Sequence, residues 1–297
     1  DRADVVIEAV VEDLQVKRGL LREAGERFPH AILASNTSSL TIASLAEGMP
    51  GPGRIAGMHF FNPVHKMPLV EVVRHAGTSP ETMAKLMKLA SSLGKVPVAV
   101  GDGPGFVVNR ILGPYLAEAV RLVGEGLAIS SVDGLMRRFG MPMGPLEVLD
   151  QVGLDVAARV APHDKVFAAM AAKGWLGAKS GKGFYVHSGK KAAAHAEAQA
   201  LVRELGDGPG MMAKLPTAAR LAEARERLVL SMVAEARRVE KAGLADAERI
   251  DLAMVFGAGW APHRGGPLAY AKARGEAEVR EALGRLAARL GERFRAG

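Results

Sequence analysis

A histidine and a glutamate twelve positions apart are the residues of this sequence best suited to chemistry. His59 and Glu71 belong to two apolar runs, 57–64 and 68–73. A neutral imidazole can accept a proton near pH 7, and a buried carboxylate beside it would fix the imidazole tautomer and stabilise the imidazolium that forms. The pattern therefore fits a general base oriented by a carboxylate. A structural pair in the core has the same spacing, and lone His/Glu pairs are more often structural.

Five motifs in a fixed order give this pair its context. The segment His59-Phe-Phe-Asn62-Pro, with Glu71 twelve residues after the histidine, resembles the catalytic segment of the L-3-hydroxyacyl-CoA dehydrogenases of fatty acid β-oxidation. Four further segments resemble that family: Asp4-Val-Val-Ile-Glu-Ala-Val-Val-Glu12 with Lys17, Ala34-Ser-Asn-Thr-Ser-Ser-Leu40, Asp102-Gly-Pro-Gly-Phe-Val-Val-Asn109-Arg110 and Pro142-Met-Gly-Pro-Leu-Glu147. The resemblance extends over nearly the whole chain, and five ordered motifs are far more specific than one.

The resemblance implies an activity and a set of site residues. The activity is the NAD-dependent oxidation of a (3S)-3-hydroxyacyl-CoA to the 3-ketoacyl-CoA, with His59 as general base and Glu71 as its partner. The positions that line the cofactor in the family are Val10, Val11, Glu12, Lys17, Ser38 and Asn62 in this sequence. The positions that contact the acyl-CoA are Ser38, Asn109 and Tyr270. His65 and His75 lie outside these motifs, and we expect them in surface loops.

Several of these residues have an alternative interpretation from local sequence. Ser38 lies just before a short helical pattern, so it could be a helix N-cap as well as a ligand of substrate or cofactor. Lys17 could belong to the solvated face of a helix. Asn109 could be an amide at the start of a helix.

Residues 1–102 alternate short apolar strands with amphipathic helices, a pattern typical of a largely parallel α/β sheet. Helices are expected over Glu12–Arg27 and Glu81–Leu93, the second ending at Gly94. Strands are expected near Val5–Ala9, Ala31–Ala34, Ile55–Phe60, Leu69–Val73 and Val96–Val100. No Gly-x-Gly-x-x-Gly segment occurs in the sequence, so we expect the later half of a Rossmann-type NAD-binding domain in an N-terminally truncated chain.

From residue 103 the pattern becomes helical, so the fold class is α/β followed by all-α. We expect a first helical domain over 103–187, a linker over 188–224 that contains Asp207-Gly-Pro-Gly, and a second helical domain over 225–297. By resemblance these are two tandem C-terminal dehydrogenase domains.

The second helical domain partly repeats the first, at an offset of 117–118 residues that grows to 122. The matching segments of the first copy are Glu118-Ala119, Gly126-Leu127-Ala128, Asp133, Met136 and Gly144-Pro145-Leu146. Those of the second are Glu235-Ala236, Gly243-Leu244-Ala245, Asp251, Met254 and Gly266-Pro267-Leu268. In this family two copies in one chain occur in multifunctional β-oxidation proteins. The resemblance thus implies the C-terminal part of such a protein, with an enoyl-CoA hydratase domain upstream, and an oligomer in the full-length form.

Composition excludes several classes of protein. The 297 residues are 48% hydrophobic and 24% charged, as in ordinary globular proteins, and the absence of cysteine excludes disulfides and thiolate metal sites. No His-x-x-x-His or clustered carboxylates indicate a metal site, and no apolar run approaches the length of a membrane span. The net charge of +7 is spread out and aromatic residues are only 5%, which argues against nucleic acid and suits an anionic CoA ester. We expect a cytoplasmic enzyme.

Two other functions remain open from the sequence. The chain could be a different hydroxy-acid dehydrogenase of similar build, although many of those use a lysine where this chain has His59 and Glu71. It could also be an inactive structural region whose tandem helical domains dock a thiolase partner.

Overall fold

A computed structural model describes residues 3–189, 191–206 and 217–295. The chain forms two compact units. Among the described residues, the first contains those up to Ile111 and Glu235–Glu276, and the second contains those between Leu112 and Ala234 and Ala277–Arg295. The domain boundaries expected from the sequence, after residues 102, 187 and 224, remain a prediction.

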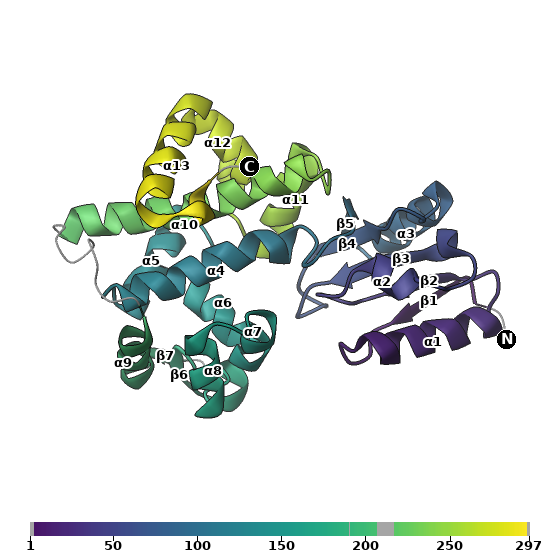
Figure 1. Cartoon of the computed structure of the whole chain (residues 1–297), viewed down its shortest axis with the longest axis horizontal. Helices are drawn as coiled ribbons and strands as arrows, with labels where there is room; N and C mark the ends of the chain where they lie inside the picture. The colour runs from purple at the N-terminus through teal and green to yellow at the C-terminus, as the bar shows by residue number, and fades with distance from the viewer. Residues whose placement is uncertain (1–2, 190, 207–216, 296–297) are drawn as a thin grey trace. The chain divides into compact units, whose positions relative to one another are not determined.

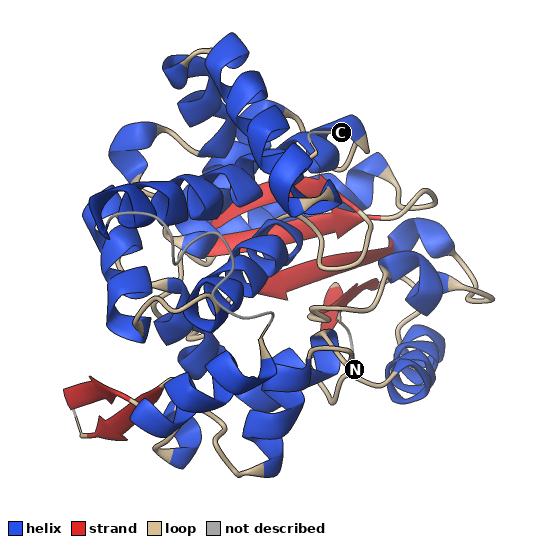
Figure 2. Cartoon of the chain, turned by 60° about the vertical axis from the view of Figure 1, so that its left-hand side comes forward, coloured by secondary structure: helices blue, strands red, loops and turns tan. Residues whose placement is uncertain are grey.

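The first unit is built on a five-stranded sheet whose strands lie side by side in sequence order, β1-β2-β3-β4-β5 (Figure 1). The strands are β1 Val5–Glu8, β2 Ile32–Ser35, β3 Ile55–Phe60, β4 Leu69–Arg74 and β5 Val96–Gly101. Each lies within one residue of its expected position. Figure 2 shows this sheet in red with helices around it.

The sheet is parallel except at one pairing. β1 with β2, β2 with β3 and β4 with β5 are parallel, as expected, whereas β3 and β4 are antiparallel. Only eight residues separate these two strands, too few for the helical crossover that a parallel pair requires.

Four helices of the first unit contact the sheet: α1 Leu14–Arg27, α2 Ile42–Ala46, α3 Pro80–Ser92 and α11 Ala247–Ala258. A fifth, α12 Pro267–Arg274, packs on α11. α3 buries Leu86 and Ala90 against Met58, Val70 and Val72 of β3 and β4. α3 ends at Ser92, and Gly94 follows in the left-handed conformation with φ 72°, as expected. α11 packs on β4 and β5, so part of the second repeat lies against the sheet.

Two long helices begin in one unit and end in the other: α4 Val108–Gly124 and α10 Thr217–Lys241. The second unit otherwise contains α5 Ile129–Phe139, α6 Pro145–Val152, α7 Leu154–Val160, α8 Lys165–Ala172, β6 Tyr185–Ser188, β7 Lys191–Ala194, α9 Ala196–Leu205 and most of α13 Glu276–Leu290. Four short 3₁₀ turns complete the described elements, at Pro52–Arg54, Ala178–Ser180, Pro262–Arg264 and Glu292–Phe294.

Regular elements occupy described parts of the segment expected to be a linker, 188–224. β7 pairs with β6, and α9 buries Ala198 and Val202 on one face. The alanine content that suggested a linker instead suits a helix, because alanine has the highest helix propensity. The expected breaker Asp207-Gly-Pro-Gly lies outside the described residues.

The two repeats are built alike. In the first, Asp133 on α5 accepts hydrogen bonds from the backbone N–H groups of Leu146 (2.8 Å) and Glu147 (3.2 Å) at the start of α6. In the second, Asp251 on α11 accepts the equivalent bonds from Leu268 (2.8 Å) and Ala269 (2.9 Å) at the start of α12. Both carboxylates cap the N-terminus of the following helix. The repeat inferred from sequence thus has a counterpart in geometry.

Candidate active site

The antiparallel pairing of β3 and β4 makes His59 and Glu71 direct neighbours. The register pairs His59 with Glu71 across the two strands. Side chains alternate between the faces of a sheet, so both lie on the face opposite Met58, Val70 and Val72. His59 Nδ1 lies 2.8 Å from Glu71 Oε2, and both side chains are buried. The spacing of twelve residues therefore reflects one cross-strand pair.

Glu71 is held in place by the start of α4. Its other oxygen, Oε1, accepts hydrogen bonds from the backbone N–H groups of Val107 (3.2 Å) and Val108 (3.0 Å). These N–H groups belong to the first turn of a helix, where they have no partner within the helix and where negative charge is favoured. Glu71 is fully buried, and three groups hydrogen bond to its carboxyl oxygens: His59 and the N–H groups of Val107 and Val108.

The surroundings of His59 leave one nitrogen open. Its ring lies 4.5 Å from the ring of Phe61 and 5.5 Å from that of Phe106, measured between centroids. Phe106 has φ 49°, which turns the chain just before α4. With the Nδ1 proton donated to Glu71, Nε2 carries the free lone pair, and no described residue hydrogen bonds to it. This is the tautomer that a general base requires.

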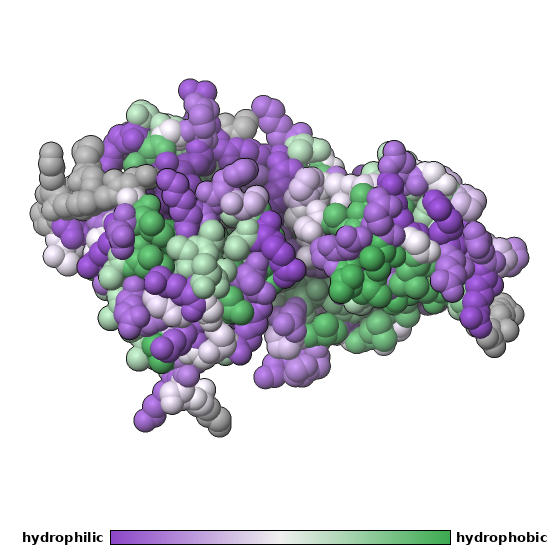
Figure 3. All heavy atoms as spheres, turned by 60° about the horizontal axis from the view of Figure 1, so that its bottom comes forward, coloured by the Kyte–Doolittle hydropathy of each residue, from purple (hydrophilic) through white to green (hydrophobic). Residues whose placement is uncertain are grey.

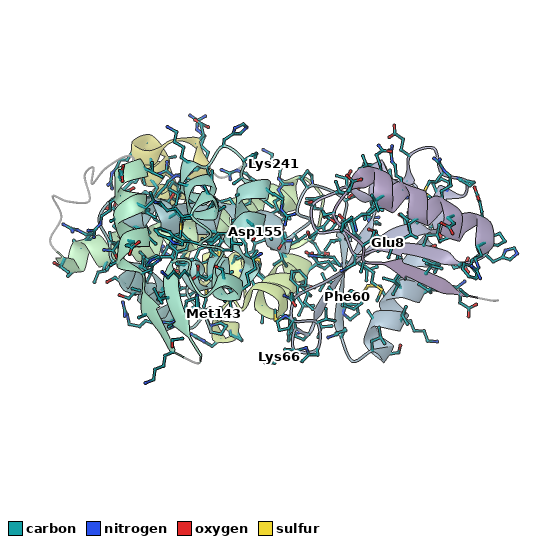
Figure 4. All side chains as sticks on the ribbon, turned by 90° about the horizontal axis from the view of Figure 1, so that it is seen from below. Glu8, Phe60, Lys66, Met143, Asp155 and Lys241 are labelled. Atoms are coloured by element: carbon teal, nitrogen blue, oxygen red, sulfur yellow. The ribbon has the colours of Figure 1, made fainter. Side chains whose placement is uncertain are left out.

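A second polar cluster lies at the carboxyl ends of β1 and β2. Lys17 is buried, and its Nζ donates to both carboxylate oxygens of Glu8 (3.1 and 3.0 Å) and to the Val10 carbonyl (3.1 Å). Glu8, labelled beside α1 in Figure 4, also accepts from the hydroxyl of Ser35. The alternative of a solvated face for Lys17 does not hold, because the helix turns this side chain onto Glu8.

Glu12 joins the loops that follow β1 and β2. Its Oε1 accepts from the Thr37 hydroxyl (2.7 Å) and from the backbone N–H groups of Ser38 (2.9 Å) and Ser39 (2.8 Å). Burial raises the pKa of Glu12, but these hydrogen bonds outweigh it and lower the pKa to about 2. Glu12 is thus a carboxylate that organises the Ser38 loop.

Ser38 is exposed, and its hydroxyl makes a long hydrogen bond to Glu12 (3.3 Å). It is not the N-cap of α2, because Thr41 has that role and accepts from the Ser44 N–H. The hydroxyl therefore lies at the rim of the sheet with no capping function.

The remaining predicted site residues lie on three elements. Val10 and Val11 form an exposed apolar loop after β1, and Asn62 is exposed in the loop after β3. Asn109 is half-buried in the first turn of α4, directly after the two N–H groups that hold Glu71. Tyr270 lies on α12, its ring 5.9 Å from that of Trp260. Among the described residues, no hydrogen bond connects Tyr270, Asn62 or Ser38 to His59.

The two other histidines near this segment, His65 and His75, lie in loops away from the pair. His65 is exposed in the loop between β3 and β4. His75 follows β4, where its Nε2 lies 3.1 Å from the Pro52 carbonyl and its Nδ1 accepts from the Gly77 N–H. Neither reaches Glu71, in agreement with the sequence expectation for loop residues.

Sequence reasoning missed the residues that support the site. Glu8 could have been found as the single charge in an apolar strand. The side chain of Asn36 accepts a hydrogen bond from the backbone N–H of Phe60 at 2.8 Å and so joins the ends of β2 and β3. Phe60, which follows His59 in the sequence, is labelled in Figure 4. Asp102 accepts from the N–H groups of Ile42 and Ala43 at the start of α2. Asn36 and Asp102 lie inside the quoted motifs, but a motif does not reveal a partner distant in sequence.

No group of three or more histidine, aspartate or glutamate side chains that could hold a metal ion occurs in the part of the chain that the structure describes. In the same residues no helix has the length and apolar character of a membrane span.

Comparison with known proteins gives a consistent result. Residues 1–103 match the NAD binding domain of 3-hydroxyacyl-CoA dehydrogenase, and residues 105–187 match the C-terminal domain of that enzyme. A fatty acid oxidation complex subunit alpha from Shewanella sp. (strain ANA-3) is 42% identical over 98% of this chain and 43% of its own length. The chain thus spans less than half of that relative.

Two solved structures are similar. The 3-hydroxybutyryl-CoA dehydrogenase of Escherichia coli aligns with 99% of this chain and 80% of its own, at 28% identity and a TM-score of 0.80. The (S)-3-hydroxybutyryl-CoA dehydrogenase of Ralstonia eutropha aligns with 62% of this chain and 71% of its own, at 40% identity and a TM-score of 0.59.

Proposed function

Because the chain belongs to the 3-hydroxyacyl-CoA dehydrogenase family, we propose that it carries the reaction centre for NAD-dependent oxidation of a (3S)-3-hydroxyacyl-CoA to the 3-ketoacyl-CoA. The observation that supports this most directly is the His59–Glu71 pair, with Nδ1 and Oε2 2.8 Å apart and Nε2 free of described partners. A core pair with a purely structural role has no need of an open nitrogen.

The proton path follows from this geometry. Nε2 of His59 accepts the proton of the substrate hydroxyl, and the O–H electrons form the new C=O bond as the hydrogen on that carbon leaves with its electron pair. NAD, when bound, supplies the acceptor of that hydride. Glu71 accepts from Nδ1 and stabilises the imidazolium that forms, while the N–H groups of Val107 and Val108 hold Glu71 in its orientation.

The residues at the carboxyl ends of β1 and β2 fit a nicotinamide nucleotide. In sheets of this kind ligands bind beyond the carboxyl ends of the strands. Val10 and Val11 offer an exposed apolar surface there, and Lys17 anchors the loop through the Val10 carbonyl. We propose that Val10, Val11, Ser38 and Asn62 line the cofactor. Lys17 and Glu12 would hold the loops that carry Val10 and Ser38 in position.

The substrate contacts are proposed on position and resemblance. Asn109 directly follows Val108, whose N–H donates to Glu71, so Asn109 belongs to the same first turn of α4. Ser38 has an exposed hydroxyl on the adjoining loop. Tyr270 is included by resemblance.

The experiment is an assay of acetoacetyl-CoA-dependent NADH oxidation in the full-length natural protein. We expect His59→Ala to lower kcat by about 10² to 10⁴-fold, the usual contribution of a general base, and Glu71→Gln to cause a smaller but strong loss. His65→Ala is the control and should retain wild-type rates. Wild-type rates in both the His59 and Glu71 variants would exclude this base.

The setting of the enzyme is a further part of the proposal. The Shewanella relative is named as a subunit of a fatty acid oxidation complex. We propose that the natural protein works in the cytoplasm within such an assembly, with a thiolase as candidate partner, and that an upstream hydratase domain accompanies it. Affinity purification from cells grown on fatty acid, followed by mass spectrometry, tests both points. Recovery of the protein without stoichiometric partners would contradict the assembly.

A further inference from the structure

Two ion pairs between the repeats are reciprocal. Arg110 of the first copy donates from Nε to Glu235 of the second copy at 2.8 Å. Arg227 of the second copy donates from Nε to Glu118 of the first copy at 2.6 Å. Each pair lies within one compact unit. Arg110 and Arg227 are 117 residues apart, and so are Glu118 and Glu235.

A third position repeats at the same offset. Arg121 lies near Glu118 at 3.4 Å, and Arg238 donates to Glu235 at 2.6 Å, each three residues after its glutamate. Equivalent residues therefore contact each other in both directions, as at a two-fold interface between identical subunits. Glu118 and Glu235 mark the repeat in the sequence, but their arginine partners become visible only in the folded chain.

The two copies differ beside the arginine. Asn109 precedes Arg110 in the first copy, and Glu226 precedes Arg227 in the second. The Gly105-Phe106 turn likewise has no equivalent in the second copy, which has Ala222-Glu223 there. The second copy therefore contains the ion-pairing residues but not the equivalents of the site residues. Only the Arg110–Glu235 pair adjoins groups of the reaction centre.

A continuous series of contacts leads from Glu235 to the base. Glu235 binds the guanidinium of Arg110, and the backbone N–H of Arg110 donates to the Gly105 carbonyl at 3.0 Å, which closes the turn. Within that turn the N–H groups of Val107 and Val108 donate to Glu71. Glu71 in turn binds His59.

Other residues of the second repeat support the same turn. The Leu244 carbonyl accepts from the Gly101 N–H at 2.6 Å, just before the turn. Gly257 on α11 packs so closely on Leu69 and Val108 that a methyl group there would lie 2.4 Å from the Leu69 side chain. The turn is thus bounded by backbone and side-chain contacts, and Glu235 is its charged contact from the second copy.

We propose that Glu235 is a positioning residue for the dehydrogenation, acting through Arg110 to hold the turn that orients Glu71 and presents Asn109. This inference rests on the proposed function. Buried ion pairs contribute little net stability but can specify one arrangement, and small displacements of a base are costly to the rate. The second repeat thereby contributes to a site whose reacting groups all belong to the first.

The chain provides a matched control. Glu118 makes the reciprocal pair and is more deeply buried than Glu235, at 1% against 8% exposure. Glu118→Gln should therefore lose at least as much thermal stability as Glu235→Gln, although no residue of the site adjoins its arginine. In the full-length natural protein we expect Glu235→Gln to lower kcat/KM by about 10- to 100-fold and Glu118→Gln by less than about twofold.

Two further readouts separate positioning from general stability. If Glu235 acts through Arg110, the double variant Arg110→Gln/Glu235→Gln should be no slower than Arg110→Gln alone. In ¹H–¹⁵N spectra of the chain itself, the amide signals of Val107 and Val108 should move in Glu235→Gln and stay in place in Glu118→Gln.

The outcomes are distinguishable from those of the proposed function. Equal rate losses in the two glutamate variants, additive losses in the double variant, or unmoved Val107 and Val108 signals would each overturn the positioning role. An inactive wild type, or an active His59→Ala, would refute the proposed function instead, whereas the spectra would still report on the contact.

Discussion

At the scale of single residues, the role of each charged side chain here depends on its hydrogen-bond donors. Glu71 and Glu12 are both carboxylates, yet Glu71 pairs with the histidine that we propose as the base, whereas Glu12 ties two loops together. Glu71 shares its oxygens between His59 and a helix start. Glu12 directs one oxygen at the Thr37–Ser39 loop. The same residue type therefore adjoins the proposed base in one case and organises a loop in the other.

Glu12 predicts a specific dependence of stability on pH. Its pKa is lowered from 4.5 to about 2 in the folded protein, so its stabilising contribution is present above pH 4.5 and is lost as the pH falls toward 2. We expect Glu12→Gln to reduce the free energy of unfolding at pH 7 by about 1 to 3 kcal/mol. Urea denaturation at pH 7 and pH 3 measures this, and the difference from wild type should shrink at the lower pH.

The control is Glu81→Gln, which removes an exposed i,i+4 ion pair with Lys85 on α3. Exposed pairs of this kind contribute little, so we expect almost no change at either pH. A Glu12 variant that behaves like the Glu81 variant would show that the Ser38 loop does not depend on this carboxylate.

At the scale of elements, the capping aspartate followed by Gly-Pro-Leu is the unit that both repeats share. Burial raises the pKa of Asp133 to about 6, although hydrogen bonds from Tyr185 and Leu146 lower it. The raised pKa means that the ionised carboxylate is held in the fold at a cost, which the helix cap and the Tyr185 hydroxyl offset. The arrangement brings the glycine of the motif directly against the aspartate.

This contact predicts an intolerance of any side chain at that glycine. A methyl group on Gly144 would lie 2.2 Å from the Asp133 Cβ. We expect Gly144→Ala to destabilise the protein by about 1 to 3 kcal/mol through overpacking. Thermal unfolding followed by circular dichroism measures the effect.

Gly284, in the middle of α13, is the matched control, since a methyl group there meets nothing within 4 Å and its chain neighbours are Leu283 and Arg285. Gly284→Ala should raise stability by about 0.5 to 1 kcal/mol, because alanine favours the helix. Equal stability of the two alanine variants would contradict the close contact between Asp133 and Gly144.

At the scale of the whole molecule, the features that bear on dinucleotide binding are the exposed edge of the sheet and the glycine pattern of the sequence. β1 forms one edge of the sheet, and exposed large apolar side chains occur on it, on the loop after it and on α1: Ile7, Val10, Val11, Val16 and Leu20. Figure 3 shows apolar surface, in green, on the first unit, which contains this sheet. No glycine-rich pyrophosphate loop of the Gly-x-Gly-x-x-Gly type is present in the sequence.

Calorimetry with NAD tests whether the chain binds the dinucleotide without such a loop. For these 297 residues alone we expect no saturable binding below about millimolar NAD, because the sequence has no Gly-x-Gly-x-x-Gly loop whose backbone N–H groups could bind the pyrophosphate. A polypeptide that joins this chain to a strand–Gly-x-Gly-x-x-Gly–helix segment should bind more tightly, and Val11→Asp should weaken that binding. Micromolar binding by the chain alone would contradict this expectation.

The sequence by itself determined the strands of the sheet, the two helices expected between them and the identity of the repeat, because these depend on local periodicity and on short motifs. It also identified His59 and Glu71 as candidates. It could not determine that the eight residues between β3 and β4 produce an antiparallel pair, which sets His59 directly opposite Glu71. Nor could it reveal that Lys17 is buried on Glu8, or that Glu235 binds Arg110. Those contacts join residues up to 125 positions apart, and only the packing of the folded chain selects such partners.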